Sequence, residues 1–224
     1  MKTFTLTLRV LGRLLGYPDT TLRAYLGDLR DALHNEHALS AGRLTELDAL
    51  IDRLAAARPL DAEATYVELF DRGRRTALHL FEHVHGDSRD RGPAMVDLVK
   101  TYEQAGLRLG PDELPDHLSV LLEYASTQPP AAARAFLREL VHLLQPIFSA
   151  LLERRSTYAS VLAAVIELAG ERAQAVPLPA EPALDDSWEE PLAFGGCSTQ
   201  GQSAPGRPQP VRIVRNNAQQ GARA

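Results

Sequence analysis

The sequence predicts an all-α protein with a single helical domain of about eight or nine helices. Apolar residues recur at spacings of three and four through most of the first 176 residues. No run of alternating β-branched residues indicates a strand, and glycine and proline stand where helices would end and begin. With 224 residues, of which 45% are hydrophobic, the chain can bury one sizeable core.

The first two helices are expected near the N-terminus. Leucine and valine recur on one face over residues 6–15, and Gly16 ends that segment. Asp19 or Thr20 can cap the next helix, which has a leucine stripe over 22–33.

Three further helices are expected before residue 87. Ser40 precedes a helix over 43–57, where leucine and isoleucine repeat at three and four. A fourth helix covers 61–71, and a fifth covers 74–86 and stops at Gly86.

Four more helices complete the predicted domain. The helix over 93–106 opens with a proline and closes with a glycine, each at the end where that residue is favoured. The helix over 114–126 has Pro115 early, and a long helix follows over 130–151. The last, over 156–173, is the most apolar and is predicted to be the most buried.

The composition changes after residue 176, so the helical domain is assigned to 1–176. Residues 177–224 hold seven of the 15 prolines and five of the 15 glycines. Such a segment buries too little apolar surface to offset its ordering entropy, which predicts a mostly disordered tail. Beyond residue 199 the tail has arginines and no acid, so it is either simply solvated or makes a weak contact with an acidic partner.

Composition narrows the class of protein. The net charge of -5 gives no overall attraction to nucleic acid. Cys197 is the one cysteine, so no internal disulfide can form. We find no secretory cleavage signal and no apolar run near the roughly 20 residues that span a bilayer. A soluble, cytoplasmic protein without membrane insertion is expected.

Residues 79–83 read H-x-x-E-H, which is a pattern of zinc peptidases. On a helix, His79 and His83 would share one face, and Glu82 would activate a metal-bound water. A third ligand is required, and nothing around Glu153 or Glu167 singles out either of them. A binding scaffold therefore competes with a zinc hydrolase as the interpretation of this stretch, and we expect no functional metal or cofactor.

Four segments together resemble the NarJ-type nitrate reductase assembly chaperones, within the wider TorD/DmsD group that serves molybdoenzymes. They are EATYVELF at 63–70, HLFEHVHGDSRDRG with AMVDLVKTYEQAG at 79–106, ELPDHLSVLLEYA at 113–125, and SWEEPLAF at 187–194. The resemblance covers roughly residues 4–194. It implies a TorD/DmsD-like helical bundle.

The resemblance also implies a function. Members of this group are not enzymes. They bind the immature catalytic (alpha) subunit of respiratory nitrate reductase, partly through its N-terminal segment. They hold it until the molybdenum cofactor and iron–sulfur cluster are inserted, and delay its docking on the membrane subunit. The chain would then act as a monomer or weak dimer. A client from another molybdoenzyme, of the dimethyl sulfoxide or trimethylamine N-oxide reductase type, is the alternative.

A client segment that folds as an amphipathic helix needs an apolar groove with a polar rim. On the predicted helices, Asp116 in a first turn and Glu123 would share an acidic face beside an apolar one, which suits a basic peptide. The candidate client-binding residues are Tyr66, Leu69, Phe70, His79, His83, Asp87, Arg89, Asp116, His117, Leu121, Glu123 and Tyr124.

Each candidate also has a structural interpretation. The Tyr66, Leu69 and Phe70 spacing is equally typical of core. Asp116 can serve the helix start, and His117 can be a buried histidine bonded to backbone. The charges from Asp87 to Arg91 can form a local ion-pair cluster, the interpretation favoured for Asp90 and Arg91.

Overall fold

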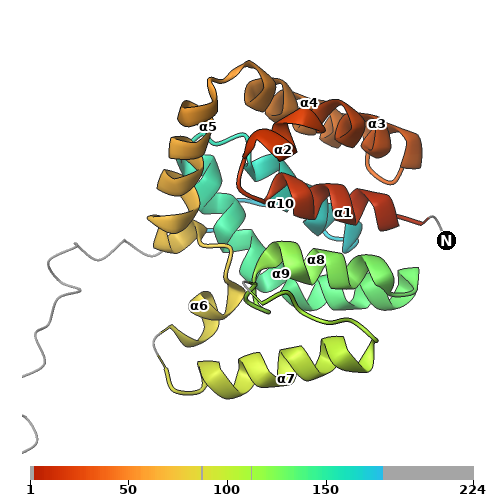
Figure 1. Cartoon of the computed structure of the whole chain (residues 1–224), viewed down its shortest axis with the longest axis vertical. Coiled ribbons are helices and arrows are strands. Elements are labelled where there is room, and N and C mark those ends of the chain that lie inside the picture. The colour runs from red at the N-terminus through yellow and green to blue at the C-terminus, as the bar shows by residue number, and fades with distance from the viewer. Residues whose placement is uncertain (1–2, 87, 112, 179–224) are drawn as a thin grey trace, which may run out of the picture. The chain divides into compact units, whose positions relative to one another are not determined.

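The computed structural model describes residues 3–86, 88–111 and 113–178, and these form helices and no strand (Figure 1). The α-helices of this part are α1 Thr5–Leu14, α2 Thr20–Ala24, α3 Leu26–Glu36, α4 Ala41–Ala56, α5 Pro59–Tyr66, α6 Leu80–His85, α7 Arg91–Gln104, α8 Leu118–Thr127, α9 Pro130–Glu153 and α10 Ala159–Leu168. A π-helical turn, η1 Val67–Asp71, and a 3-10 turn, η2 Arg74–Thr76, join α5 to α6. The all-α prediction is confirmed. Residues 179–224 of the predicted tail lie outside the described residues.

Side chains cap two helix starts, and the cap predicted at Asp19 is confirmed. Asp19 Oδ1 accepts a hydrogen bond from the Leu22 amide at 2.7 Å, and Ser40 Oγ accepts from the Arg43 amide at 3.4 Å. The single helix expected from residue 20 is wrong, because Tyr25 ends α2 and begins α3. This division gives ten α-helices in the described part, where about eight or nine were predicted.

The core is built around α10. Every residue of α10 except Glu167 is buried, which confirms that this helix is the most enclosed. It packs against α9, α4 and α1, while α1 also packs on α8 and α3. The strongly apolar composition of α10 is what allows it to be surrounded on all sides.

The long helix α9 is apolar enough to cross a bilayer by length and composition alone, which the sequence analysis did not expect. Buried core helices of soluble proteins meet the same criteria of length and composition. α9 packs against α8 and α10. We therefore assign α9 to the core.

Two helix boundaries that matter for the site were predicted wrongly. Residues 77–79 are extended between η2 and α6, so no continuous helix covers 74–86. The helix expected over 114–126 begins only at Leu118. The cause is a pairing between the two segments: the Leu118 amide donates to Leu78 O at 2.9 Å, and the Leu80 amide donates to Asp116 O at 3.0 Å.

An aromatic cluster fills the space beneath α5 and η1. The ring of Tyr66 lies 5.6 Å from that of Tyr17, 4.8 Å from that of Phe70 and 6.2 Å from that of Tyr158. The Tyr66 hydroxyl donates to Leu15 O at 2.7 Å. The π-helical turn follows directly and sends Leu69 and Phe70, which are adjacent in sequence, both into the core.

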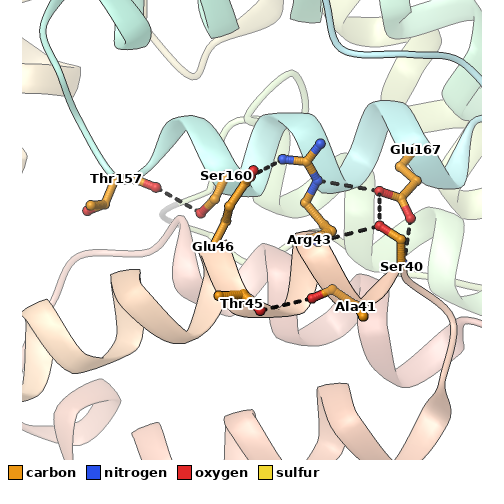
Figure 2. A network of polar contacts seen from close by, with 8 residues as sticks. All are labelled: Ser40, Ala41, Arg43, Thr45, Glu46, Thr157, Ser160 and Glu167. Carbon is orange, nitrogen blue, oxygen red and sulfur yellow. Dashed lines mark hydrogen bonds and ion pairs between the residues drawn. The ribbon is translucent and has the colours of Figure 1, made fainter.

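A polar clamp joins the start of α4 to α10 (Figure 2). Glu167 accepts from the Ser40 amide at 2.7 Å, from Ser40 Oγ at 3.2 Å and from Arg43 Nε at 3.4 Å. Arg43 also pairs with Glu46 on the exposed face of α4. One partly buried carboxylate thus satisfies donors at a helix start, where backbone amides have no intrahelical partner.

We expect Glu167→Ala to lower the free energy of unfolding by about 1–2 kcal/mol, because three donors lose their acceptor. Urea denaturation measures this loss. Glu46→Ala is the matched control, since its exposed pair with Arg43 should contribute at most about 0.5 kcal/mol. Equal losses in the two variants would show that Glu167 is no more than a surface pair.

Candidate functional site

The extended residues 77–79 and the loop before α8 form the base of the candidate site. His79 and His117 face each other as an isolated antiparallel bridge, and their ring centroids lie 4.9 Å apart. His79 directly precedes α6, and His117 caps α8 by accepting the Ser119 amide on Nδ1 at 3.3 Å. The backbone pairing therefore sets the two imidazoles side by side.

A buried carboxylate holds this arrangement together. The Asp116 side chain is 0% exposed. Its Oδ1 lies 3.2 Å from His79 Nδ1, and its Oδ2 accepts from the Phe81 amide at 3.2 Å. Arg91, in the first turn of α7, places Nη2 3.6 Å from Oδ2 and 3.4 Å from Glu82 Oε1. Asp116 thereby ties the starts of α6 and α7 to the loop before α8.

The environment of Asp116 favours its charged form. Burial, the largest single influence, raises the pKa of this carboxyl, and the hydrogen bond and charge of His79 lower it. The Phe81 amide and the Arg91 charge act in the same direction, so the pKa of Asp116 lies below its ordinary value. The carboxylate is therefore ionised at neutral pH.

His117 is held neutral. Burial, and then the neighbouring charge of His79, lower the pKa of His117 from 6.5 to about 4, although Asp116 acts in the opposite direction. Because Nδ1 accepts the Ser119 amide, the proton of this neutral ring is assigned to Nε2.

A cleft of about 730 Å³ opens beside these histidines, between α1 and α8. Its lining includes His79 and His117 at the base. Arg9 and Arg13 come from α1, and Glu113 and Glu123 come from the loop before α8 and from α8 itself. Tyr66 and the exposed apolar side chains of Tyr17 and Leu114 also line it. The cleft thus combines both signs of charge with exposed apolar surface.

Gly12 allows the two walls of the cleft to approach closely. A Cβ at this position would lie 3.2 Å from Ser119 O and 3.6 Å from Leu122 Cβ. Arg9 Nε donates to Ser126 Oγ at 3.2 Å and links the same two helices one turn away. The helices α1 and α8, which form the two walls of the cleft, are therefore in tight contact with each other.

Four of the predicted site residues line the cleft, and the other described candidates do not. Tyr66, His79, His117 and Glu123 line the cleft. Of the remaining described candidates, Leu69, Phe70 and Leu121 are core residues. The Tyr124 ring packs between those of Tyr102 and Phe136. His83 Nε2 bonds Ala77 O at 2.9 Å, and Arg89 is exposed before α7. Asp87 lies outside the described residues.

The predicted placement of Asp116 is wrong. It lies two residues before α8, so it shares no helix face with Glu123. The local ion-pair cluster favoured for Asp90 and Arg91 is replaced by longer-range contacts: Asp90 bonds Ser88, and Arg91 pairs with Glu82 and Asp116. Local spacing could not show that Arg91 reaches a carboxylate 25 residues further along the chain.

The H-x-x-E-H segment does not adopt the geometry that a zinc peptidase needs. His79 lies before α6 and not inside it, so His79 and His83 are not one turn apart on a helix face. His79 contacts Asp116, and Glu82 pairs with Arg91. Among the described residues, no three histidine, cysteine or acidic side chains gather as metal ligands would.

Sequence reasoning missed the contribution of α1. Arg9, Arg13 and Tyr17 line the cleft, as do Glu113 and Leu114 from the loop before α8. A signal was present: Gly12 lies inside the predicted first helix, where a glycine usually has a packing reason.

A solved structure shares the fold of this chain. The crystal structure of an Archaeoglobus fulgidus protein, described as a redox enzyme maturation protein, matches with a TM-score of 0.53. The match covers 76% of this chain and 96% of that chain at 19% sequence identity, which shows a shared fold.

Sequence comparison gives the family. The model of the family called nitrate reductase delta subunit matches residues 19–164. Escherichia coli K12 NarJ, named a nitrate reductase molybdenum cofactor assembly chaperone, is 43% identical over 160 residues, which are 71% of this chain and 68% of NarJ. E. coli NarW, described in the same terms, is 37% identical over 193 residues, 82% of this chain and 80% of NarW.

The chain belongs to the nitrate reductase delta subunit family. The resemblance drawn from the sequence segments is therefore confirmed. These relatives are named as chaperones and not as enzymes.

We expect Asp116→Asn to lower the free energy of unfolding by about 3 kcal/mol, because Arg91 loses its buried counter-charge and the Phe81 amide and His79 lose a charged partner. Chemical denaturation at neutral pH measures the loss. Asp97→Asn is the control, since Asp97 pairs with Lys100 on an exposed surface and should cost about 0.5 kcal/mol or less. A loss as small as that of the control would contradict the clamping role of Asp116.

His117 should make stability depend on pH. Its folded pKa, about 4, lies below the unfolded value of 6.5, so the unfolded chain takes up a proton that the folded chain excludes. Stability is therefore expected to fall as pH drops from 6.5 towards 4. His117→Asn keeps an acceptor for the Ser119 amide and cannot titrate in this range. Denaturation curves at several pH values should show a shallower fall for the variant, and parallel curves would refute the assignment.

Proposed function

We propose that this chain is a system-specific chaperone for the catalytic subunit of respiratory nitrate reductase. It binds the immature subunit through that subunit's N-terminal segment, in the cleft between α1 and α8. It holds the subunit during insertion of the molybdenum cofactor and iron–sulfur cluster, and delays docking on the membrane subunit. The family membership and the names of the relatives support this proposal.

The composition of the cleft is the structural observation that carries it. A peptide helix with apolar and basic side chains needs apolar surface for one face and carboxylates for the other. Tyr17 and Leu114 supply exposed apolar surface, while Glu113 and Glu123 supply negative charge in the same cleft. Arg9 and Arg13 can in turn meet an acidic group of the client.

The histidines at the base give the cleft a defined hydrogen-bonding character. His117 is neutral near pH 7, so it offers a donor and not a positive charge to a bound segment. Asp116, buried beneath it, holds the base and does not reach the client. The residues proposed to contact the client are therefore the described residues that line the cleft.

Binding of a synthetic N-terminal segment of the nitrate reductase catalytic subunit tests the cleft. We expect Glu123→Gln to weaken binding about 3- to 10-fold in a calorimetric titration, because a charged partner is lost at a partly solvated rim. Glu46→Gln removes an equivalent charge on the exposed face of α4 and should leave affinity unchanged. Equal affinity for both variants and the unchanged chain would remove Glu123 from the site.

Capture of the client from cells tests the identity of the partner. The tagged full chain, recovered from cells grown anaerobically on nitrate, is expected to bring down the nitrate reductase catalytic subunit before cofactor insertion. A different molybdoenzyme subunit, of the dimethyl sulfoxide or trimethylamine N-oxide reductase type, would overturn the client assignment. Full nitrate respiration in a strain lacking the gene would overturn the chaperone role itself.

A further inference from the structure

A second hollow lies on a part of the molecule that the proposed client cleft does not use. It has a volume of about 250 Å³ and opens between α4, α5 and the turn that joins α9 to α10. None of its lining residues lines the cleft. Its walls are apolar, with Leu50 and Leu54 from α4 and Ala62 from α5. We call this hollow the basic pocket, for the reason that follows.

Three arginines and one acid line the basic pocket. Arg53 comes from α4, and Arg154 and Arg155 directly follow α9. The acid, Asp61, is already held by Arg58 through contacts of 2.5 Å and 2.8 Å. The pocket therefore has a surplus of positive charge that no carboxylate of the lining balances.

The pocket is also lined by a tyrosine whose hydroxyl is unused. The Tyr158 hydroxyl is buried and has no hydrogen-bond partner among the described residues. Its ring is fixed by edge contacts with Phe70 at 5.1 Å and Tyr66 at 6.2 Å. Burial raises the pKa of this hydroxyl, so it stays protonated and can donate. A buried polar group without a partner is costly, so an acceptor that reaches this hydroxyl would be favoured.

The backbone at Arg155 adds a further observation. Arg155 follows α9 with a φ of 52°, in the left-handed region that favours glycine. The turn is closed by the Ser156 amide, which donates to Leu151 O at 2.9 Å. A glycine would form this turn with less strain, but it would not bring a guanidinium to the pocket.

Size and chemistry narrow the ligand. At about 250 Å³ the pocket is smaller than typical cofactor sites, and it is large enough for one or two side chains. Guanidinium groups and a hydroxyl donor match a carboxylate, and the apolar walls match an adjacent aliphatic side chain.

We propose that the basic pocket is a second polypeptide-binding site that takes an acidic side chain presented beside an apolar one. The side chains that this pocket takes are opposite in charge to those of the basic, amphipathic segment proposed for the cleft. Together the two sites would let the chaperone contact two separate stretches of an unfolded client. This site depends on the proposed function in one respect only: the protein must encounter unfolded polypeptide, as a chaperone does.

Fluorescence anisotropy with two labelled peptides tests the pocket on the full chain. The probe is an eight-residue peptide with two Leu-Glu pairs flanked by Gly and Ser, and its counterpart has Gln in place of Glu. We expect the Glu peptide to bind more weakly as salt rises and the Gln peptide to bind at least tenfold more weakly than the Glu peptide.

Three variants locate that binding. Arg155→Gly and Arg53→Gln should each weaken the Glu peptide about tenfold. Arg155→Gly suits the left-handed backbone, so it should not unfold the protein. Tyr158→Phe should weaken binding about 3- to 10-fold without lowering stability, since the hydroxyl has no internal partner to lose. Arg138→Gln is the control, because Arg138 is an exposed arginine of α9 that pairs with Glu171.

Two results would overturn the proposal: equal binding of the Glu and Gln peptides, or Arg155→Gly and Arg53→Gln variants that behave like the Arg138→Gln control. Titration of the same variants with the basic N-terminal client segment separates this proposal from the cleft. If that segment still binds and responds to Glu123→Gln, only the basic pocket is refuted. If it fails to bind while the Glu peptide binds, only the cleft is refuted.

Discussion

A carboxylate sealed from solvent determines how the site is assembled. Asp116 accepts from the backbone of α6 and pairs with His79 and with Arg91 at the start of α7. Such a group is costly to bury unless every lone pair is used. Three segments that are distant in sequence are therefore held in one arrangement, and α7, which has Tyr102 as its one buried residue, gains an anchor at its start.

The cleft follows from that arrangement and from one small residue. Because the loop before α8 is fixed by Asp116, His117 caps α8 and sets where this helix begins. α8 then lies against α1 at Gly12, where a larger residue would crowd Ser119. The charged groups of the cleft come from two helices and a loop whose relative positions depend on these two contacts.

The aromatic cluster separates two places with different electrostatic character. Tyr66 lines the cleft, Tyr158 lines the basic pocket, and their rings are in contact. The cleft mixes both signs of charge, whereas the pocket is lined by three arginines and one paired acid. A holding protein for an unfolded subunit needs binding surfaces and no reactive group, and this division of chemistry is consistent with that requirement.

The sequence by itself determined the all-helical class, the cap at Asp19, the burial of α10 and the family. These depend on periodicity, local hydrogen bonds and ordered motifs, which a linear chain displays directly. Only the tertiary structure decided that His79 precedes a helix and that Asp116 is a buried clamp. Both follow from pairing between residues almost 40 positions apart. Such pairing overrides local helical spacing because it satisfies backbone groups and a buried charge together.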